Sequence, residues 1–149
     1  MSAVPTAAVE ITRPATLEHL PEFLACLDEA ARAAGVDDET AFALHLATEE
    51  ACANVVHHGY PDAPGPLTLR VEVTPNAVTV VLTDEAVPFD PDRVPAPPLD
   101  GSVEDRPIGG LGWHLIREVT DEARHESPPA GGNRLTLVKH RPSSSSLHE

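Results

Sequence analysis

The chain has 149 residues, which suits one domain that buries roughly two thirds of the surface of its unfolded form. Hydrophobic residues make up 41 %, so we expect a folded core and no global disorder. Ten basic and 24 acidic residues give a formal net charge of −14, which argues against a nucleic-acid or anionic-membrane partner. A protein, or a phosphate compound carried with a metal ion, matches this charge better.

The cysteines and the chain ends indicate a cytoplasmic protein. Cys26 and Cys52 lie in helical patterns without a Cys-x-x-Cys spacing, so we expect small buried thiols in a reducing compartment. No segment approaches the ~20 apolar residues of a membrane span, and no basic region followed by an apolar one opens the chain. We expect one domain over residues 7–141 and a flexible polar tail over residues 142–149.

The first two predicted elements are a strand and a helix. Ala7 to Arg13 alternates loosely between apolar and polar residues, which predicts an edge strand closed by Pro14. Thr16 is a candidate cap for a helix whose leucines repeat at helical spacing until Gly35.

The second predicted helix is largely buried. It is expected to begin at Asp37 or Asp38 and to end at Gly59-Tyr60. Two apolar stripes follow it. One stripe contains Phe42, Leu46, Ala53 and Val56, and the other contains Leu44, Ala51 and Val55.

Polar residues interrupt this helix near its end. Glu50 and Asn54 stand one turn apart and share a face. Because buried polar groups need partners, the pair is either a solvated or internally hydrogen-bonded rim or a catalytic carboxylate beside a metal-ligating amide. His57 and His58 point about 100° apart on a helix, so we do not expect them to share a metal ion. His58 is expected to close the helix end beside the site.

The remaining segments complete an α+β pattern. Leu67–Val73 and Val78–Leu82 alternate like a hairpin, and the proline-rich residues 92–108 suggest a lid or a binding loop. A glycine cluster opens a third helix that ends at Val119, in which Trp113 is expected to pack in the core. Strands are expected over residues 123–126 and 134–139. The order predicts a two-layer sandwich, with one mostly antiparallel mixed sheet and the helices on one face.

The glycine cluster Gly109-Gly110-Leu111-Gly112 has the properties of a phosphate site. Glycines let backbone amides approach phosphate oxygens, and the helix N-terminus favours an anion. The cluster fits neither of the two common nucleotide fingerprints, so alone it is equally compatible with a hinge.

Four ordered segments together resemble the ATP-binding domain of the GHKL superfamily, and within it the small bacterial anti-sigma-factor serine/threonine kinases. The resemblance covers roughly residues 11–139. Its segments are Glu50 to Tyr60, similar to the N box; Asp84 to Pro91 and Gly109 to Ile116, similar to the two glycine boxes; and Gly132 to Leu137, similar to the closing strand.

This resemblance implies a Bergerat-type ATP-binding fold that binds ATP and Mg²⁺. It implies that Asn54 ligates Mg²⁺, that Glu50 is the catalytic base, and that Asp84 accepts a hydrogen bond from the adenine amino group. Thr136 would lie near the same ring. The other implied binding residues are His58, Pro88, Phe89, Gly109, Gly110, Leu111 and Gly112.

The first glycine box departs from the family at two positions. Ala86 stands where glycine is usual, and Pro88 stands where many members have a second glycine. A methyl group near the adenine, or a backbone position that prefers positive φ, is expected to weaken nucleotide binding.

The resemblance implies a serine/threonine kinase that phosphorylates a small STAS-type antagonist protein, sequesters a sigma factor, or does both, and that pairs as a homodimer. The alternative is a nucleotide-binding module that sequesters a partner without phosphotransfer. A histidine kinase half and an ATP hydrolase fit less well, because the chain shows neither an acceptor-histidine helix pair nor additional domains.

Overall fold

The computed structural model describes residues 7–60, 62–88 and 110–142. Within these residues the chain forms five strands, three α-helices and one π-helical turn. In chain order the elements are β1 (Ala7–Pro14), α1 (Leu20–Ala33), α2 (Asp38–Asn54), the π-helix η1 (Val55–Gly59), β2 (Pro66–Val73), β3 (Ala77–Asp84), α3 (Gly110–Val119), β4 (Glu122–Glu126) and β5 (Asn133–His140).

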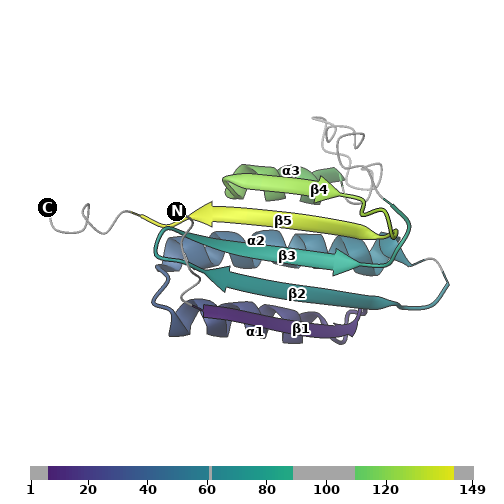
Figure 1. The fold of residues 1–149 in the computed structure, drawn as a ribbon, viewed down its shortest axis with the longest axis horizontal. Coiled ribbons are helices and arrows are strands. Elements are labelled where there is room, and N and C mark those ends of the chain that lie inside the picture. The colour runs from purple at the N-terminus through teal and green to yellow at the C-terminus, as the bar shows by residue number, and fades with distance from the viewer. Residues whose placement is uncertain (1–6, 61, 89–109, 143–149) are drawn as a thin grey trace, which may run out of the picture.

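The strands form one sheet with the order β1-β2-β3-β5-β4. All four neighbouring pairs are antiparallel. For β2 and β3 the short hairpin between them requires this direction. The helices lie together behind the sheet, so the molecule has two layers (Figure 1). The predicted α+β sandwich is confirmed, with a sheet that is antiparallel at each of these pairings.

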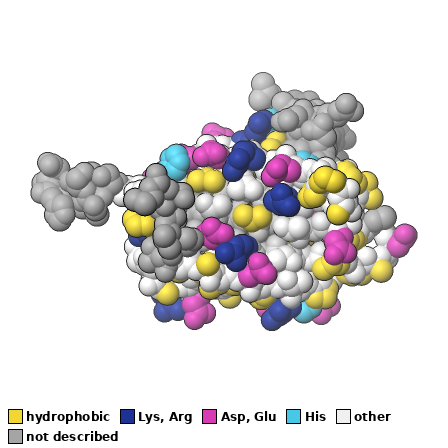
Figure 2. Space-filling view, viewed as in Figure 1, with side chains coloured by type: hydrophobic (Ala, Val, Ile, Leu, Met, Phe, Trp, Pro, Cys, Tyr) yellow, Lys and Arg dark blue, Asp and Glu magenta, His cyan; other side chains and the backbone are white. Residues whose placement is uncertain are grey.

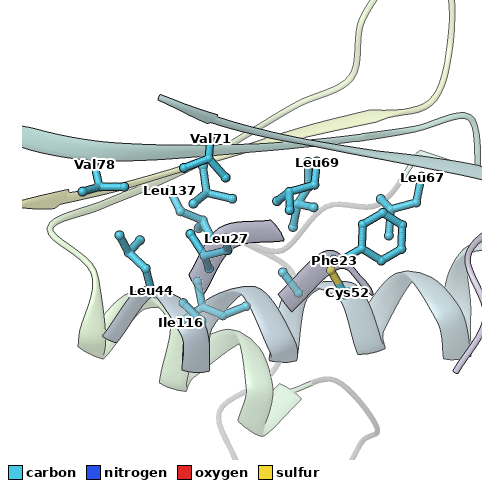
Figure 3. Close-up of a cluster of buried hydrophobic side chains, with 14 of the residues drawn as sticks. Phe23, Leu27, Leu44, Cys52, Leu67, Leu69, Val71, Val78, Ile116 and Leu137 are labelled. Carbon is cyan, nitrogen blue, oxygen red and sulfur yellow. The ribbon is translucent and has the colours of Figure 1, made fainter. Parts of the chain in front are cut away.

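The core lies between the sheet and the helices (Figure 3). Strict alternation in β2 and β3 turns every second side chain toward the helices, where it is fully buried. The side chains that meet there include Leu67, Leu69, Val71 and Val78 from the sheet and Phe23, Leu27, Leu44, Cys52 and Ile116 from the helices.

The other face of the sheet is polar. Figure 2 shows basic and acidic side chains beside one another over the strands. Arg70 Nε lies 2.7 Å from Glu72 and its Nη1 lies 3.8 Å from Glu10. Such exposed pairs contribute at most about 1 kcal/mol each, so this face is a solvated surface that adds little to stability.

The helix caps differ in part from the prediction. Helix α1 begins at Leu20, and Thr16 is not its cap; the N-cap is His19, which makes no side-chain cap bond. Pro21 in the first turn explains the later start, since proline suits the first helical positions, where its missing N–H costs nothing. The predicted cap of α2 is confirmed, because Asp37 Oδ2 accepts a hydrogen bond from the Thr40 N–H at 3.0 Å.

Helix α2 buries only one of its two predicted stripes. Phe42 is 66 % exposed, so the first stripe is wrong at its N-terminal end. Leu44, Ala47 and Ala51, spaced by three and four residues, face the core instead. The α-helical pattern stops at Asn54 and continues as a π-helix, a distortion often found at functional sites.

The two cysteines and Trp113 are buried to different degrees. Cys52 is fully buried, which raises the pKa of its thiol to about 12, while Cys26 is partly buried. Both thiols are free, as predicted. Trp113 is only 4 % exposed and belongs to the core, as predicted.

Among residues 7–60, 62–88 and 110–142, no helix has the length and apolarity to cross a membrane.

Arg141 fastens the end of β5 to the helical layer. Its guanidinium donates hydrogen bonds to the carbonyl oxygens of Thr74 at 2.8 Å, Gly35 at 3.2 Å and Ala34 at 3.5 Å. The last two carbonyls lie at the C-terminal end of α1, where helices leave acceptors unpaired. We propose on this basis that the domain extends to residue 141, as predicted.

We expect Arg141→Ala to lower the free energy of unfolding by about 1–2 kcal/mol, because it leaves these carbonyls without their donor. Urea denaturation at equilibrium measures the change. Arg124→Ala is the matched control, since Arg124 is exposed and lies 3.8 Å from Glu122 in a surface ion pair on the polar face. Equal losses in the two variants would contradict the anchoring role.

Candidate functional site

Asp84 is the last residue of β3 and is only 7 % exposed. Its Oδ1 accepts two hydrogen bonds, from the Ala86 N–H at 2.9 Å and from Asn133 Nδ2 at 3.0 Å. The described part of the chain gives its Oδ2 no hydrogen bond. The carboxylate is therefore held by one oxygen, and the other can accept a hydrogen bond from a ligand.

Asn133 is a neighbour of Asp84 that was not among the predicted site residues. It opens β5 directly opposite Asp84 in the strand register. Besides its bond to Asp84, its Nδ2 donates to the Val87 carbonyl oxygen at 3.0 Å. Its place right after Gly132, where the closing strand begins, was the signal available in the sequence.

Thr136 lies elsewhere than expected. It pairs with Val81 in the register between β3 and β5. Leu135 and Leu137 on either side of it belong to the core layer, so Thr136 faces the opposite, polar side of the sheet. Asp84 and Asn133 share the core-facing side, which contradicts the predicted placement of Thr136 beside the same ligand ring.

Ala86 does not carry the backbone strain that was expected of it. No residue other than glycine has positive φ in the described ranges. Ala86 is buried, and a Cβ built on Gly59 would lie 3.2 Å from its methyl group. The alanine therefore packs against the glycine that ends η1. Pro88, the next candidate on this segment, is exposed, and Phe89 lies outside the described residues.

Tyr60 ties the turn after Asp84 to the rest of the sheet. Its hydroxyl donates to the Pro66 carbonyl oxygen at 2.6 Å and accepts from the Glu85 N–H at 2.7 Å. Burial raises the pKa of Tyr60, and the hydrogen bond from Glu85 opposes that rise. The residue after η1 thus fixes the position of the residue after Asp84.

Glu50 and Gly112 bring a second pair of segments together. Glu50 and Asn54 are both half-buried in the last turns of α2. A Cβ built on Gly112, in the first turn of α3, would lie 2.7 Å from Glu50 Oε2. A side chain at position 112 would require the Glu50 carboxylate to move from its present position. Gly110 opens the same turn, followed by Leu111, and Gly109 lies outside the described residues.

Oxygen donors dominate the candidate metal position. Asn54 offers an amide oxygen, a hard ligand that suits Mg²⁺ when phosphate oxygens and waters complete its shell, and the Glu50 carboxylate lies one turn away on the same helix. The residues therefore fit this ion. His57 and His58 are exposed, with ring centroids 6.2 Å apart. The described ranges contain no group of three or more His, Cys, Asp or Glu side chains placed to hold a metal.

A groove on the helical layer lies apart from these residues. It has a volume of about 470 Å³ and runs between α1 and α2. None of the candidate residues lines it. Its walls are Asp28, Arg32, Val36, Asp38, Ala41, Phe42 and His45.

Comparisons with known proteins give consistent results. The sequence model of the histidine kinase-like ATPase domain matches residues 13–139. A protein named serine-protein kinase RsbW from Halalkalibacterium halodurans is 31 % identical over 135 residues, which cover 88 % of this chain and 82 % of that protein. The serine/threonine-protein kinase BtrW from Bordetella bronchiseptica is 32 % identical over 100 residues, covering 66 % of this chain and 70 % of that one.

A solved structure shares the fold. A crystal structure of the RsbU and RsbW domains of a Mycobacterium tuberculosis protein superimposes with a TM-score of 0.66 at 22 % identity. The match covers 94 % of this chain and 34 % of that one.

Proposed function

The chain belongs to the histidine kinase-like ATPase domain family, and from that premise we propose that it is an ATP-dependent serine/threonine protein kinase of the anti-sigma regulatory type. The observation that carries this proposal is the contact between α2 and α3. There the carboxylate of Glu50 lies close to Gly112 in the first turn of α3, which supports a base at Glu50 beside phosphates bound at that turn.

The start of α3 suits the phosphates. Its first backbone N–H groups have no partner within the helix, and its dipole favours a negative charge at that end. Gly112 has no side chain to obstruct the space beside Glu50, and we propose that Gly109, Gly110 and Leu111 complete the cradle.

The end of β3 suits the adenine ring of the nucleotide. Asp84 Oδ2 can accept a hydrogen bond from the amino group of adenine, while Oδ1 is fixed by Ala86 and Asn133. A guanine would turn its carbonyl oxygen toward the same carboxylate, and two acceptors repel each other. We propose that His58, Pro88 and Phe89 contribute to the rim of this site.

The transfer itself needs positioning and charge neutralisation. Asn54 would hold Mg²⁺, which when bound neutralises charge on the phosphate oxygens. Glu50 accepts the proton of the incoming serine hydroxyl and aligns its oxygen with the γ-phosphate. Both side chains project from the same face of α2, one turn apart, so one helix sets the distance between them.

We propose that the partners are proteins. Relatives are named serine-protein kinase and, for a protein from Clostridium novyi, anti-sigma F factor. These names support a sigma factor as the sequestered partner and a protein as the substrate. We further propose that the substrate is a small STAS-type antagonist and that the kinase pairs as a homodimer. The net charge of −14 disfavours nucleic acid as a partner.

Thermal unfolding with ATP or ADP, in Mg²⁺ and in chelator, tests the nucleotide site. A ligand at a hundredfold excess over Kd stabilises the native state by about 2.7 kcal/mol, so the melting temperature should rise by several degrees. Asp84→Asn should lose this rise. Asp28→Asn, in the groove between α1 and α2, is the matched control and should keep it.

If Asp28→Asn abolished the rise in melting temperature and Asp84→Asn preserved it, the nucleotide would bind in the groove between α1 and α2. That result would contradict the proposal. If millimolar nucleotide did not raise the melting temperature, the alternative would hold, in which the chain binds a protein partner without phosphotransfer.

A further inference from the structure

Three strands are joined by polar side chains at the end of the sheet that holds the candidate site. His125 on β4 contacts Asn133 on β5, with 2.7 Å between His125 Nε2 and Asn133 Oδ1. Asn133 in turn contacts Asp84 on β3, with 3.0 Å between Nδ2 and Oδ1. Asp84 and Asn133 are both nine-tenths buried, at 7 % and 8 % exposure.

The chemistry of the partners fixes the orientation of the Asn133 amide. Nδ2 faces the Asp84 carboxylate and the Val87 carbonyl oxygen at 3.0 Å, and both of these groups can only accept hydrogen bonds. The NH₂ group must therefore point to them, which turns Oδ1 toward His125. An amide oxygen only accepts, so His125 carries a proton on Nε2.

We propose that His125 and Asn133 are positioning residues that set the preference of the site for a purine with an amino group at C6. His125 fixes the amide of Asn133, and the amide fixes Asp84 Oδ1, which leaves Oδ2 directed to the ligand. The inference deepens the proposed function and rests on it, because it takes Asp84 as the residue that contacts the base.

The same amide also controls the turn that follows β3. Because Asn133 Nδ2 bonds both Asp84 and Val87, the carboxylate and the turn keep one relative position. Without Asn133, Asp84 Oδ1 would keep only the Ala86 N–H, and the carboxylate would be free to rotate. A buried network of this kind rigidifies a site only when every member is paired. Loss of His125 should therefore loosen Asp84 through Asn133, although His125 forms its bond with Asn133 and not with Asp84.

The test compares the Kd of ADP with that of IDP, whose base has a carbonyl oxygen in place of the C6 amino group. Isothermal titration calorimetry on the full chain gives both constants. A hydrogen bond to a charged group corresponds to a preference of about tenfold or more for ADP in the wild type. His125→Gln should keep that preference, because the glutamine amide can place a donor near the position of Nε2.

His125→Leu and Asn133→Ala should lower the preference toward one, mainly by weakening ADP binding. Circular dichroism at the titration temperature verifies that each variant is folded, and His125→Leu still reports if Asn133→Ala does not fold. Equal weakening of ADP and IDP, with the preference kept, would mean that the two residues only pack and would overturn the inference.

The wild type separates this inference from the proposed function. Tight ADP binding without preference over IDP would overturn the inference alone. Absence of ADP binding by the wild type would overturn the proposed function and this inference with it.

Discussion

Replacing Glu50 with glutamine should reduce phosphotransfer at least ~10²-fold and leave the affinity for ATP nearly unchanged. A positioned general base typically contributes 10²–10⁴-fold, and glutamine keeps the shape of the side chain but cannot take a proton. The loss should appear in kcat, because the role we propose for the carboxylate is on the serine hydroxyl during transfer and not on the nucleotide.

The measurement is transfer of labelled phosphate from ATP to an antagonist protein, with nucleotide affinity followed by calorimetry. Glu49→Gln is the matched control, since its side chain points about 100° away on the same helix, and it should transfer at the wild-type rate. Wild-type transfer by Glu50→Gln would remove the residue from the mechanism. Loss of both transfer and ATP affinity would make it a binding residue instead.

Gly132→Ala should be the most damaging single-methyl change near the site. Gly132 has φ of +81°, and a Cβ there would lie 2.1 Å from the Asp84 carbonyl oxygen. A backbone atom cannot move aside as a side chain can, so β5 would have to retreat from Asp84. We expect the free energy of unfolding to fall by about 2–3 kcal/mol. We also expect the variant to lose the rise in melting temperature with nucleotide.

Gly131→Ala is the control that separates the effect of a clash with the Asp84 backbone from the effect of placing alanine at positive φ. Gly131 also has positive φ, at +102°, but nothing lies within 4 Å of the position of an added Cβ. We expect it to lose about 1 kcal/mol and to keep its response to nucleotide. Urea denaturation and thermal shift measure the pair. Similar results for the two variants would show that the approach of Gly132 to Asp84 has no special role.

Much of the fold follows from local pattern. The alternation in β2 and β3 predicted the central hairpin, because each strand has one face in the core and one in water. The carboxylate of Asp37 marked the start of α2, and the ordered motifs identified the family. These features depend on neighbours in sequence, so the sequence reveals them.

The misplacements concern which face a residue takes. Phe42 fits a helical stripe, but the stripe through Leu44 faces the sheet, and the choice depends on how α2 is rotated against β3 and β5. Thr136 and Asn133 differ by three positions in one strand, so they take opposite faces. Strand pairing with β3 decides which one meets Asp84, and that register is set by contacts distant in sequence.

Glycines mark where distant segments of the chain approach each other closely. Gly112 beside Glu50 unites two motifs that are 62 positions apart in the sequence (112 − 50 = 62). The expectation about Ala86 came from its departure from the glycine-box pattern, which says nothing about its neighbours in space. In the described residues Ala86 has no positive φ, and its methyl group packs beside Gly59.

The most direct test is a crystal structure of the chain with Mg²⁺ and a non-hydrolysable ATP analogue. We expect the adenine amino group within hydrogen-bond distance of Asp84 Oδ2, the phosphates at the first turn of α3, and the γ-phosphate facing Glu50 and Asn54. A nucleotide bound in the groove beside Phe42, or one whose base lies away from Asp84, would contradict it.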